Sequence, residues 1–125
     1  MEPSVEVYTI NPDGTGEMVL TENAVRDGDP GWSPDGAFIT FESFRDTVSE
    51  VYKMAADGSN VTRLTFSGAN EDRSTSWSPD GTRIAFHSTR DALPADAPPG
   101  SSRFEIYVMK ADGSNQVRLT ENVAQ

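Results

Sequence analysis

The sequence lacks cysteine altogether, has a single histidine, and carries only ten basic residues against twenty acidic ones. The absence of cysteine excludes disulfides, zinc ribbons and thiol catalysis. The net charge of −10 disfavours nucleic acid and anionic bilayers as partners, because both carry the same sign of charge. No apolar run reaches roughly eighteen residues, and residues 1–10 lack the basic start and apolar stretch of a signal peptide. We therefore expect no nucleic acid partner, no membrane insertion and no signal peptide within this chain.

A repeat organises what is present. The segment Trp32 to Gly36 (WSPDG) recurs as Trp77 to Gly81, at a shift of 45 residues. A phrase with a central Tyr and a final Asp-Gly occurs three times, at 7–14, 51–58 and 106–113, and each copy is followed by Leu-Thr. The spacings of this phrase are 44 and 55 residues, so the second interval contains an insertion. Periods of this length indicate a repeat architecture.

The segments inside each repeat are typical of strands. Residues 37–43 and 83–88 are short, rich in β-branched and aromatic side chains, and bounded by Asp-Gly or polar turn residues. Four antiparallel strands in about 40–45 residues predict a β-propeller blade. The fold class is therefore all-β: a propeller segment of about two and a half four-stranded antiparallel blades, not closed by itself. We place a half blade at 1–23, a complete blade at 24–66, and a second at 67–125 with a loop insertion at about 91–102.

The repeated phrases resemble a known family. Trp-Ser-Pro-Asp-Gly, Ile-Ala-Phe, Ser-x-Arg-Asp, Ile-Tyr-Val-Met-x-Ala-Asp-Gly-Ser-Asn and Arg-Leu-Thr are similar to the repeat of TolB-type, WD-repeat-like propellers, from about Val5 to Thr120. The first copy departs from this pattern at residues 11–16, and the insertion also lies outside it. The resemblance implies a periplasmic or secreted protein. The same kind of repeat also occurs in propellers that precede some serine peptidase domains.

One face of the predicted propeller varies between copies. The Ser-Pro-Asp-Gly and Ala-Asp-Gly-Ser-Asn turns are nearly identical, whereas residues 21–28, 44–49, 66–73 and 89–103 on the opposite face differ. Because binding residues concentrate on loops carried by a rigid scaffold, this variable face is the expected binding surface; free variation of loops is the alternative. The insertion is expected to be an extended flap rather than a strand. The candidate binding residues on this face are Asp27, Arg45, Asp46, Asp72, Arg73, Arg90 and Asp91.

Two of these candidates occupy matching places before the innermost strands. Asp27 and Asp72 lie 45 residues apart, and a complete ring of such aspartates could form an acidic channel mouth that holds calcium. The alternative is hydrogen bonding of the crossover, or pairing with Arg73 and its neighbours. No metal site is assigned, since no loop fits the usual calcium pattern. The repeated pairs Arg45-Asp46 and Arg90-Asp91 are interpreted as local charge pairs at strand ends.

The remaining conspicuous residues are assigned to structure. Trp32 and Trp77 are expected to fill the gaps between blades, and Tyr8, Tyr52 and Tyr107 likewise. His87 is the only histidine and its repeat partner is Glu42, which argues against a shared catalytic role. The sequence has no nucleophile elbow, no His-Glu-x-x-His and no phosphate loop.

These observations predict a non-enzymatic propeller scaffold for protein or ligand binding, without a cofactor. The alternative is the propeller portion of a hydrolase or peptidase whose catalytic residues lie outside this chain. The expected partner is a protein, or a second copy through open blade faces. The chain begins with the last two strands of a blade and ends after the fourth strand of another. The two ends together therefore do not supply the four strands of one blade. We therefore expect an excerpt of a longer propeller, or an association with an irregularly paired N-terminal hairpin.

Overall fold

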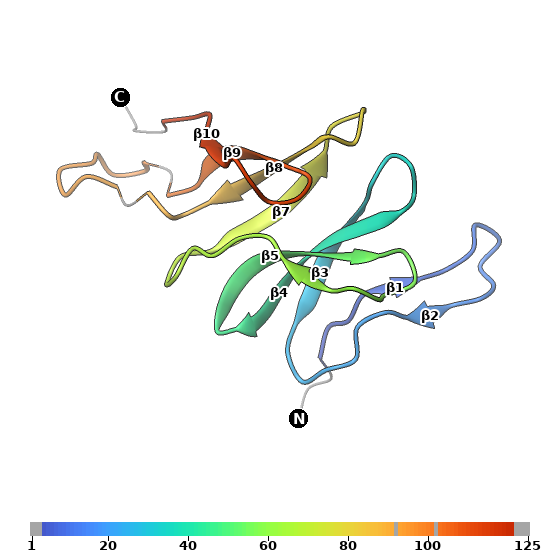
Figure 1. The fold of residues 1–125 in the computed structure, drawn as a ribbon. Coiled ribbons are helices and arrows are strands. Elements are labelled where there is room, and N and C mark those ends of the chain that lie inside the picture. Colours follow the sequence, from blue (N-terminus) through green and yellow to red (C-terminus); the bar gives the residue numbers. More distant parts are fainter. Residues whose placement is uncertain (1–3, 92, 102, 122–125) are drawn as a thin grey trace.

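The computed structural model describes residues 4–91, 93–101 and 103–121. These residues form ten strands and no helix, so none of them belongs to a helix long and apolar enough to cross a membrane (Figure 1). The strands are β1 (Tyr8–Thr9), β2 (Met18–Val19), β3 (Asp27–Trp32), β4 (Phe38–Asp46), β5 (Val48–Ala55), β6 (Thr62–Arg63), β7 (Asp72–Trp77), β8 (Arg83–Ser88), β9 (Glu105–Lys110) and β10 (Val117–Arg118).

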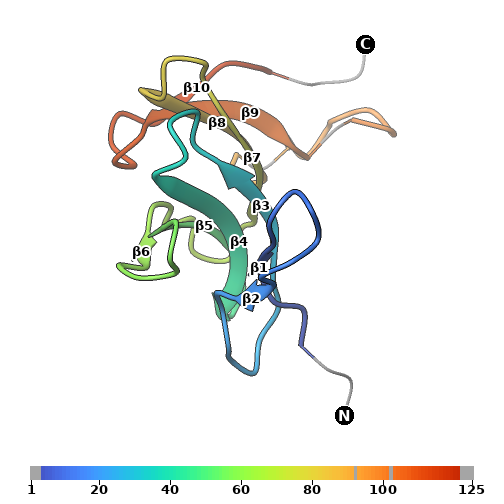
Figure 2. The same cartoon turned by 90° about the vertical axis from the view of Figure 1, so that its right-hand side faces the viewer.

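The strands form three separate antiparallel sheets. The hairpin β1–β2 stands alone, while β3-β4-β5-β6 and β7-β8-β9-β10 are four-stranded sheets in chain order. Figure 2 shows the sheets following one another rather than merging into one. Both inner strand pairs have a register shift, between Gly28 and Gly31 and between Arg73 and Ser76. The predicted all-β architecture of two complete blades and one half blade is confirmed.

The repeated Ser-Pro-Asp-Gly turns join the first two strands of each blade. In the first, the Ser33 hydroxyl donates to the Asp35 carboxylate at 2.7 Å, and the Ala37 amide donates to the same oxygen at 3.0 Å. Gly36 adopts a φ of +72°, a conformation that side chains with a Cβ rarely take. The same bonds recur at Asp80. The identical turn sequences therefore reflect identical turn geometry.

Two apolar layers hold the sheets together. We call the face of a blade that contacts the preceding unit its leading face, and the opposite face its trailing face. One layer joins the first blade's leading face to the hairpin and consists of Val7, Ile39, Phe41, Tyr52 and Met54, with Leu20 packed against it. The other joins the two blades and consists of Val51, Leu64, Ile84, Phe86, Tyr107 and Met109, with Trp77 packed against it.

Glycine permits a close approach at each of these contacts. A Cβ on Gly113 would lie 3.0 Å from the Leu64 carbonyl oxygen, and one on Gly58 would lie 3.1 Å from the Leu20 carbonyl oxygen. Both glycines belong to the Ala-Asp-Gly turn of one unit and meet the Leu-Thr phrase of the unit before it. The repeat therefore specifies the contacts between neighbouring units as well as the strands within each unit.

Two expected core aromatics lie outside these layers. Trp77 packs between the blades as predicted, but Trp32 is 54% exposed. Tyr52 and Tyr107 are buried, whereas Tyr8 is 54% exposed. The prediction for Trp32 and Tyr8 is wrong because neither residue has a complete neighbouring blade in the described residues. No blade covers the leading face of the hairpin, which carries Tyr8. The hairpin itself lacks the inner strands that would cover Trp32.

The connections also differ from expectation: the last two residues of 21–28 and of 66–73 belong to β3 and β7. Residues 44–49, expected as a loop, are largely strand: β4 runs to Asp46 and β5 begins at Val48, with Thr47 at a φ of +75° between them. Apolar and aromatic side chains at both flanks favour this tight hairpin. The described residues of the insertion, 91 and 93–101, contain turns and no strand, with Ala97 donating to Pro94 O at 3.0 Å.

Candidate functional site

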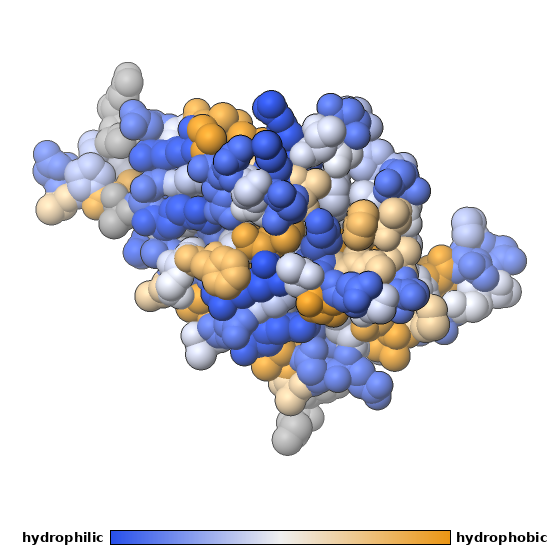
Figure 3. Space-filling view, in the orientation of Figure 1, coloured by the Kyte–Doolittle hydropathy of each residue, from blue (hydrophilic) through white to orange (hydrophobic). Residues whose placement is uncertain are grey.

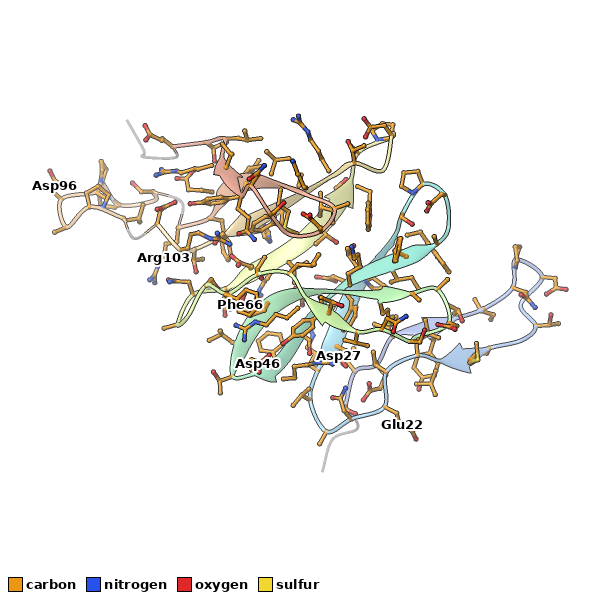
Figure 4. All side chains as sticks on the ribbon, in the orientation of Figure 1. Glu22, Asp27, Asp46, Phe66, Asp96 and Arg103 are labelled. Carbon is orange, nitrogen blue, oxygen red and sulfur yellow. The ribbon has the colours of Figure 1, made fainter. Side chains whose placement is uncertain are left out.

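The candidate residues lie on one side of the molecule, where strands β4 and β8 end and strands β3 and β7 begin. Figure 4 shows this side as a band from Glu22 at the bottom, past Asp27, Asp46 and Phe66, to Asp96 at the far left. We call it the loop face. The Ser-Pro-Asp-Gly and Asp-Gly-Ser-Asn turns lie at the opposite ends of the strands, which we call the turn face.

Asp27 is the first residue of β3 and is fully buried. Its Oδ2 accepts from Arg45 Nη2 at 3.1 Å and from Asn23 Nδ2 at 2.6 Å. Arg45 Nε donates in turn to the Ser43 hydroxyl at 2.8 Å. Asp27 therefore anchors the start of the innermost strand to the end of its neighbour, and presents no carboxylate to solvent.

Asp72 repeats this arrangement in the second blade. Its Oδ2 accepts from Arg90 Nη2 at 2.7 Å, and Arg90 Nε donates to the Ser88 hydroxyl at 3.0 Å. Burial raises the pKa of Asp72, with Arg90 acting in the opposite direction. Within the described residues, Oδ1 of both Asp27 and Asp72 is buried without a hydrogen-bond partner. Each aspartate depends on its arginine for compensation of a buried charge.

The two arginines also lie over aromatic rings of their own blades. The Arg45 guanidinium is 4.7 Å from the Tyr52 ring centroid, and that of Arg90 is 4.6 Å from the Tyr107 centroid. Contacts of this kind add cation–π attraction. Ion pairing, ring contact and hydroxyl bonding all fix Arg45 and Arg90 in place, so both are structural parts of the blade end.

The expected local charge pairs are not the pairs that form. Arg45 pairs with Asp27 rather than Asp46, and Asp46 instead lies 3.4 Å from Arg63 Nη1 and accepts from the Tyr52 hydroxyl. Asp91 likewise lies 3.8 Å from Arg118. The interpretation as sequence-adjacent pairs is wrong. Arg45 and Asp46 are adjacent residues of β4, and adjacent strand residues point to opposite faces of a sheet. Arg90 and Asp91 follow the end of β8, and Arg90 turns back to Asp72 at the start of β7.

Arg73 does not pair with Asp27 or Asp72 either. Its Nη2 lies 2.9 Å from Glu71, and its guanidinium lies 5.6 Å from the Phe44 ring centroid. Nearby Glu42 is buried against Arg26 at 3.3 Å, and burial raises its pKa, with Asp29 adding to the effect. Across the sheet from Arg73, His87 packs on Phe104 at 4.8 Å, and burial lowers its pKa.

A second repeated network was not predicted from the sequence. Thr65 Oγ1 accepts from the Val51 amide at 2.9 Å and donates to buried Glu50 at 2.6 Å, and Arg63 Nη2 donates to the same carboxylate at 3.0 Å. The hairpin and the second blade repeat the pattern with the pairs Glu6–Thr21 and Glu105–Thr120. The signal was present: in all three copies Glu directly precedes the Tyr phrase, and Thr is the second residue of the Leu-Thr that follows the phrase.

The loop face contains a hollow at its variable segments, with a volume of about 370 Å³, which is lined by Val48, Ala69, Asn70, Glu71, Thr89, Arg103 and Phe104. A second hollow on this face, of about 300 Å³, is lined by Asn23, Ala24, Val25 and Arg45. Phe66, 72% exposed, lies on the same face with Arg63 stacked 4.4 Å from its ring centroid. Figure 3 shows orange apolar patches separated by blue hydrophilic surface. Among the described residues, no group of three or more His, Asp or Glu side chains is arranged to hold a metal ion.

Comparisons with known proteins agree with the repeat. Residues 2–95 match the family described as TolB beta propeller domain. The Tol-Pal system protein TolB of Geobacter sulfurreducens is 39% identical over 63 residues, which are 50% of this chain and 14% of that protein. The chain spans about a fifth or less of the length of the curated relatives it matches.

Solved structures match over nearly the whole chain. The structure of a putative TolB from Agrobacterium tumefaciens matches with a TM-score of 0.76 at 32% identity. The match covers 90% of this chain and 40% of the Agrobacterium chain. The tricorn protease matches at a TM-score of 0.67 and 16% identity, over 96% of this chain and 10% of its own, which shows a shared fold alone. From its repeat, its blades and these matches, the chain belongs to the TolB β-propeller family.

Proposed function

We propose that this chain is a non-enzymatic propeller scaffold whose loop face binds a protein partner. The observation that carries the proposal is the hollow of about 370 Å³, formed where the first blade's crossover and the end of the insertion meet. Most of its lining comes from segments that differ between blades, so the repeat does not account for this hollow. Loops on a rigid scaffold are the usual place for such specificity.

Exposed Phe66 supplies an anchor on the same face, three residues before Ala69 of the hollow's lining. The ring is 72% exposed although Arg63 covers part of one face. Aromatic and arginine side chains dominate the energetics of protein interfaces, because they bury a large area and also offer polar contacts. Phe66 and Arg63 together therefore fit the centre of a protein interface better than a small-molecule site.

The turn face also contains a hollow, of about 380 Å³, lined in part by Pro34, Phe38, Trp77 and Pro79. Its lining belongs to the turns that are repeated between blades and to strand residues beside them, and Lys53 Nζ donates to the Ala111 carbonyl oxygen at 2.5 Å. We assign this hollow to blade packing. The tricorn protease shares the fold, but a likeness at 16% identity does not favour a peptidase role for this chain.

We also propose a periplasmic or secreted setting for the chain. The name of one relative, a Tol-Pal system protein, supports this part of the proposal. Four of the candidate residues support the binding loops rather than contact the partner. The ion pairs of Asp27 with Arg45 and of Asp72 with Arg90 hold the strand ends that carry these loops. Asp46, Arg73 and Asp91 are proposed to contribute charge at the rim.

A random-peptide display library tests the proposal. Peptides selected on the immobilised chain are measured by fluorescence anisotropy against the unchanged chain, Phe66→Ser and Phe38→Ser. Phe38 is a matched control because it is a partly exposed phenylalanine on the turn face. We expect Phe66→Ser to weaken binding at least tenfold and Phe38→Ser to leave it unchanged. Selected peptides that depend on Phe38 and ignore Phe66 would overturn the proposal.

A further inference from the structure

The hollow of about 370 Å³ on the loop face has one basic side chain in its lining, that of Arg103. Arg103 is exposed and directly follows the insertion, so it lies outside the repeated phrases. Among the ion pairs that the described residues form, none includes Arg103. No carboxylate of the described part of the chain therefore neutralises this guanidinium by contact.

The other arginines at this end of the strands are all paired. Each has a guanidinium nitrogen between 2.7 and 3.4 Å from an acidic oxygen, and the six are Arg26, Arg45, Arg63, Arg73, Arg90 and Arg118. Their charge is already compensated within the chain, so they attract an outside carboxylate less than an unpaired arginine does. Arg103 differs from them in its surroundings and not in its chemistry.

Glu71 is the acidic residue of the same lining, and it already has a partner. Arg73 Nη2 lies 2.9 Å from the Glu71 carboxylate, and Arg73 itself does not belong to the lining. The charge of Glu71 is therefore compensated by an arginine from outside the lining, while the charge of Arg103 remains. In a chain with a net charge of −10, the hollow is a local positive site.

Two neutral side chains of the lining can also donate hydrogen bonds. Thr89 Oγ1 accepts from the Glu71 amide at 3.0 Å, and among the described residues no acceptor takes the hydroxyl proton of Thr89. Asn70 Nδ2 donates to the Ser67 carbonyl oxygen at 3.0 Å and has a second N–H. An ionised carboxylate only accepts hydrogen bonds, so one guanidinium with two neutral donors suits it.

From these contacts we infer that Arg103 binds a carboxylate of the partner, an inference that rests on the loop-face function proposed above. The planar guanidinium can donate two parallel hydrogen bonds to one carboxylate. Val48, Ala69 and Phe104 line the rest of the hollow, so a bound segment removes water from the pair and strengthens its attraction.

The partner group is a single carboxylate and not an acidic run. A net charge of −10 on the chain opposes the approach of a strongly acidic segment. The ligand is therefore a neutral or basic segment with one carboxylate at the contact. An Asp or Glu side chain and a free carboxyl terminus present the same group, and the experiment separates these two sources.

Peptides selected on the immobilised chain from a library with free carboxyl termini are the probe. Each peptide that needs Phe66 is resynthesised with one carboxylate removed at a time. Side chains are changed from Glu to Gln or from Asp to Asn, and the terminus is amidated. We expect one of these changes to raise the dissociation constant about tenfold, as fluorescence anisotropy measures it.

Arg103→Gln is the matching change in the chain. It is expected to weaken binding of the unchanged peptide about tenfold and to leave binding of the peptide without its carboxylate unaltered, because the two changes remove one interaction. Arg83→Gln is the control, since Arg83 is also exposed and has no ion pair among the described residues, but lies at the start of β8 near the turn face. Circular dichroism checks the fold of both variants.

Selection on Arg103→Glu gives a second readout. The peptides it yields are expected to have Lys or Arg where those selected on the unchanged chain have the carboxylate. The inference is overturned if Phe66-dependent peptides bind Arg103→Gln and the unchanged chain equally, if the two changes add independently, or if Arg83→Gln weakens binding as much. The loop-face function then stands. Peptides that ignore Phe66 and depend on Phe38 overturn that function, and this inference with it.

Discussion

The Cβ position of Gly113 lies 3.0 Å from the carbonyl oxygen of Leu64, in the preceding blade. This approach joins the Ala-Asp-Gly turn of one blade to the Leu-Thr phrase of the preceding blade. The two phrases belong to the same repeat, but they meet each other only between neighbouring units. Gln116 Nε2 strengthens the junction by donating to the same carbonyl oxygen at 3.0 Å. The repeat therefore encodes how one blade meets the next.

Gly113→Ala is expected to lower the free energy of unfolding more than Gly36→Ala does. Both glycines have a positive φ, at +87° and +72°, so both substitutions carry a strain of about 1–2 kcal/mol. Only Gly113 has a backbone atom within 4 Å of the new methyl group, whereas Gly36 has open space. Urea unfolding measures the difference. Equal losses would show that the close approach is not part of the contact.

Arg90→Ala is expected to destabilise the chain by about 2–3 kcal/mol, because it leaves the buried carboxylate of Asp72 without its ion pair. A fully buried pair loses ~3–5 kcal/mol, and the smaller figure reflects an arginine side chain that is 23% exposed. Arg83→Ala removes an exposed arginine at the start of β8, the strand that Arg90 follows, and serves as the control. A loss with Arg90→Ala no larger than that of the control would contradict the structural role of this pair.

Thr65→Val keeps the shape of a buried side chain and removes its hydroxyl. The Val51 amide then has no acceptor and Glu50 loses a donor, so we expect a loss of about 1–3 kcal/mol. Thr62→Val, in the same segment, is the control because Thr62 is exposed. Chemical denaturation with fluorescence detection measures both. If the two variants unfold at the same urea concentration, the Glu-Thr network does not stabilise the blade.

The turn aspartates predict acid sensitivity. Hydrogen bonds from Ser78 and Thr82 lower the pKa of Asp80 from 3.8 to about 2. A carboxyl group whose pKa is lower in the folded state stabilises the fold above its unfolded pKa, and this contribution is lost as the pH falls from 3.8 towards 2. Asp80→Asn keeps an acceptor oxygen and cannot titrate, so its unfolding midpoint should fall less between about pH 5 and pH 3.

The control for this titration is Asp96→Asn, which removes an exposed carboxylate in the insertion, away from the Ser-Pro-Asp-Gly turns. Its pH dependence should match that of the unchanged chain. An Asp80→Asn variant that loses stability in acid as steeply as the unchanged chain would contradict the assignment.

The sequence predicted the strands, the blade count and the turn chemistry, because these depend on local residue patterns that the repeat displays several times. It placed Tyr52 and Trp77 correctly between units. It failed for Tyr8 and Trp32, since burial there depends on whether a neighbouring unit is present and not on the residue itself.

The candidate site was predicted less well than the fold. Asp27 and Asp72 were recognised as equivalent, but their partners Arg45 and Arg90 were assigned to adjacent aspartates. Register between strands decides such pairs, and spacing along the chain does not reveal it. The hollow on the loop face was also beyond prediction, because Val48, Asn70 and Phe104 come from three distant parts of the chain whose relative positions only the fold determines.

The central claim is that the loop face, and not the turn face, meets a partner. Site-specific photo-crosslinking in cells that produce the chain tests it most directly, with a benzophenone amino acid placed at Phe66 in one variant and at Phe38 in the other. The account predicts a discrete crosslinked protein adduct from position 66 and none from position 38. A discrete adduct from position 38, with none from position 66, would contradict it.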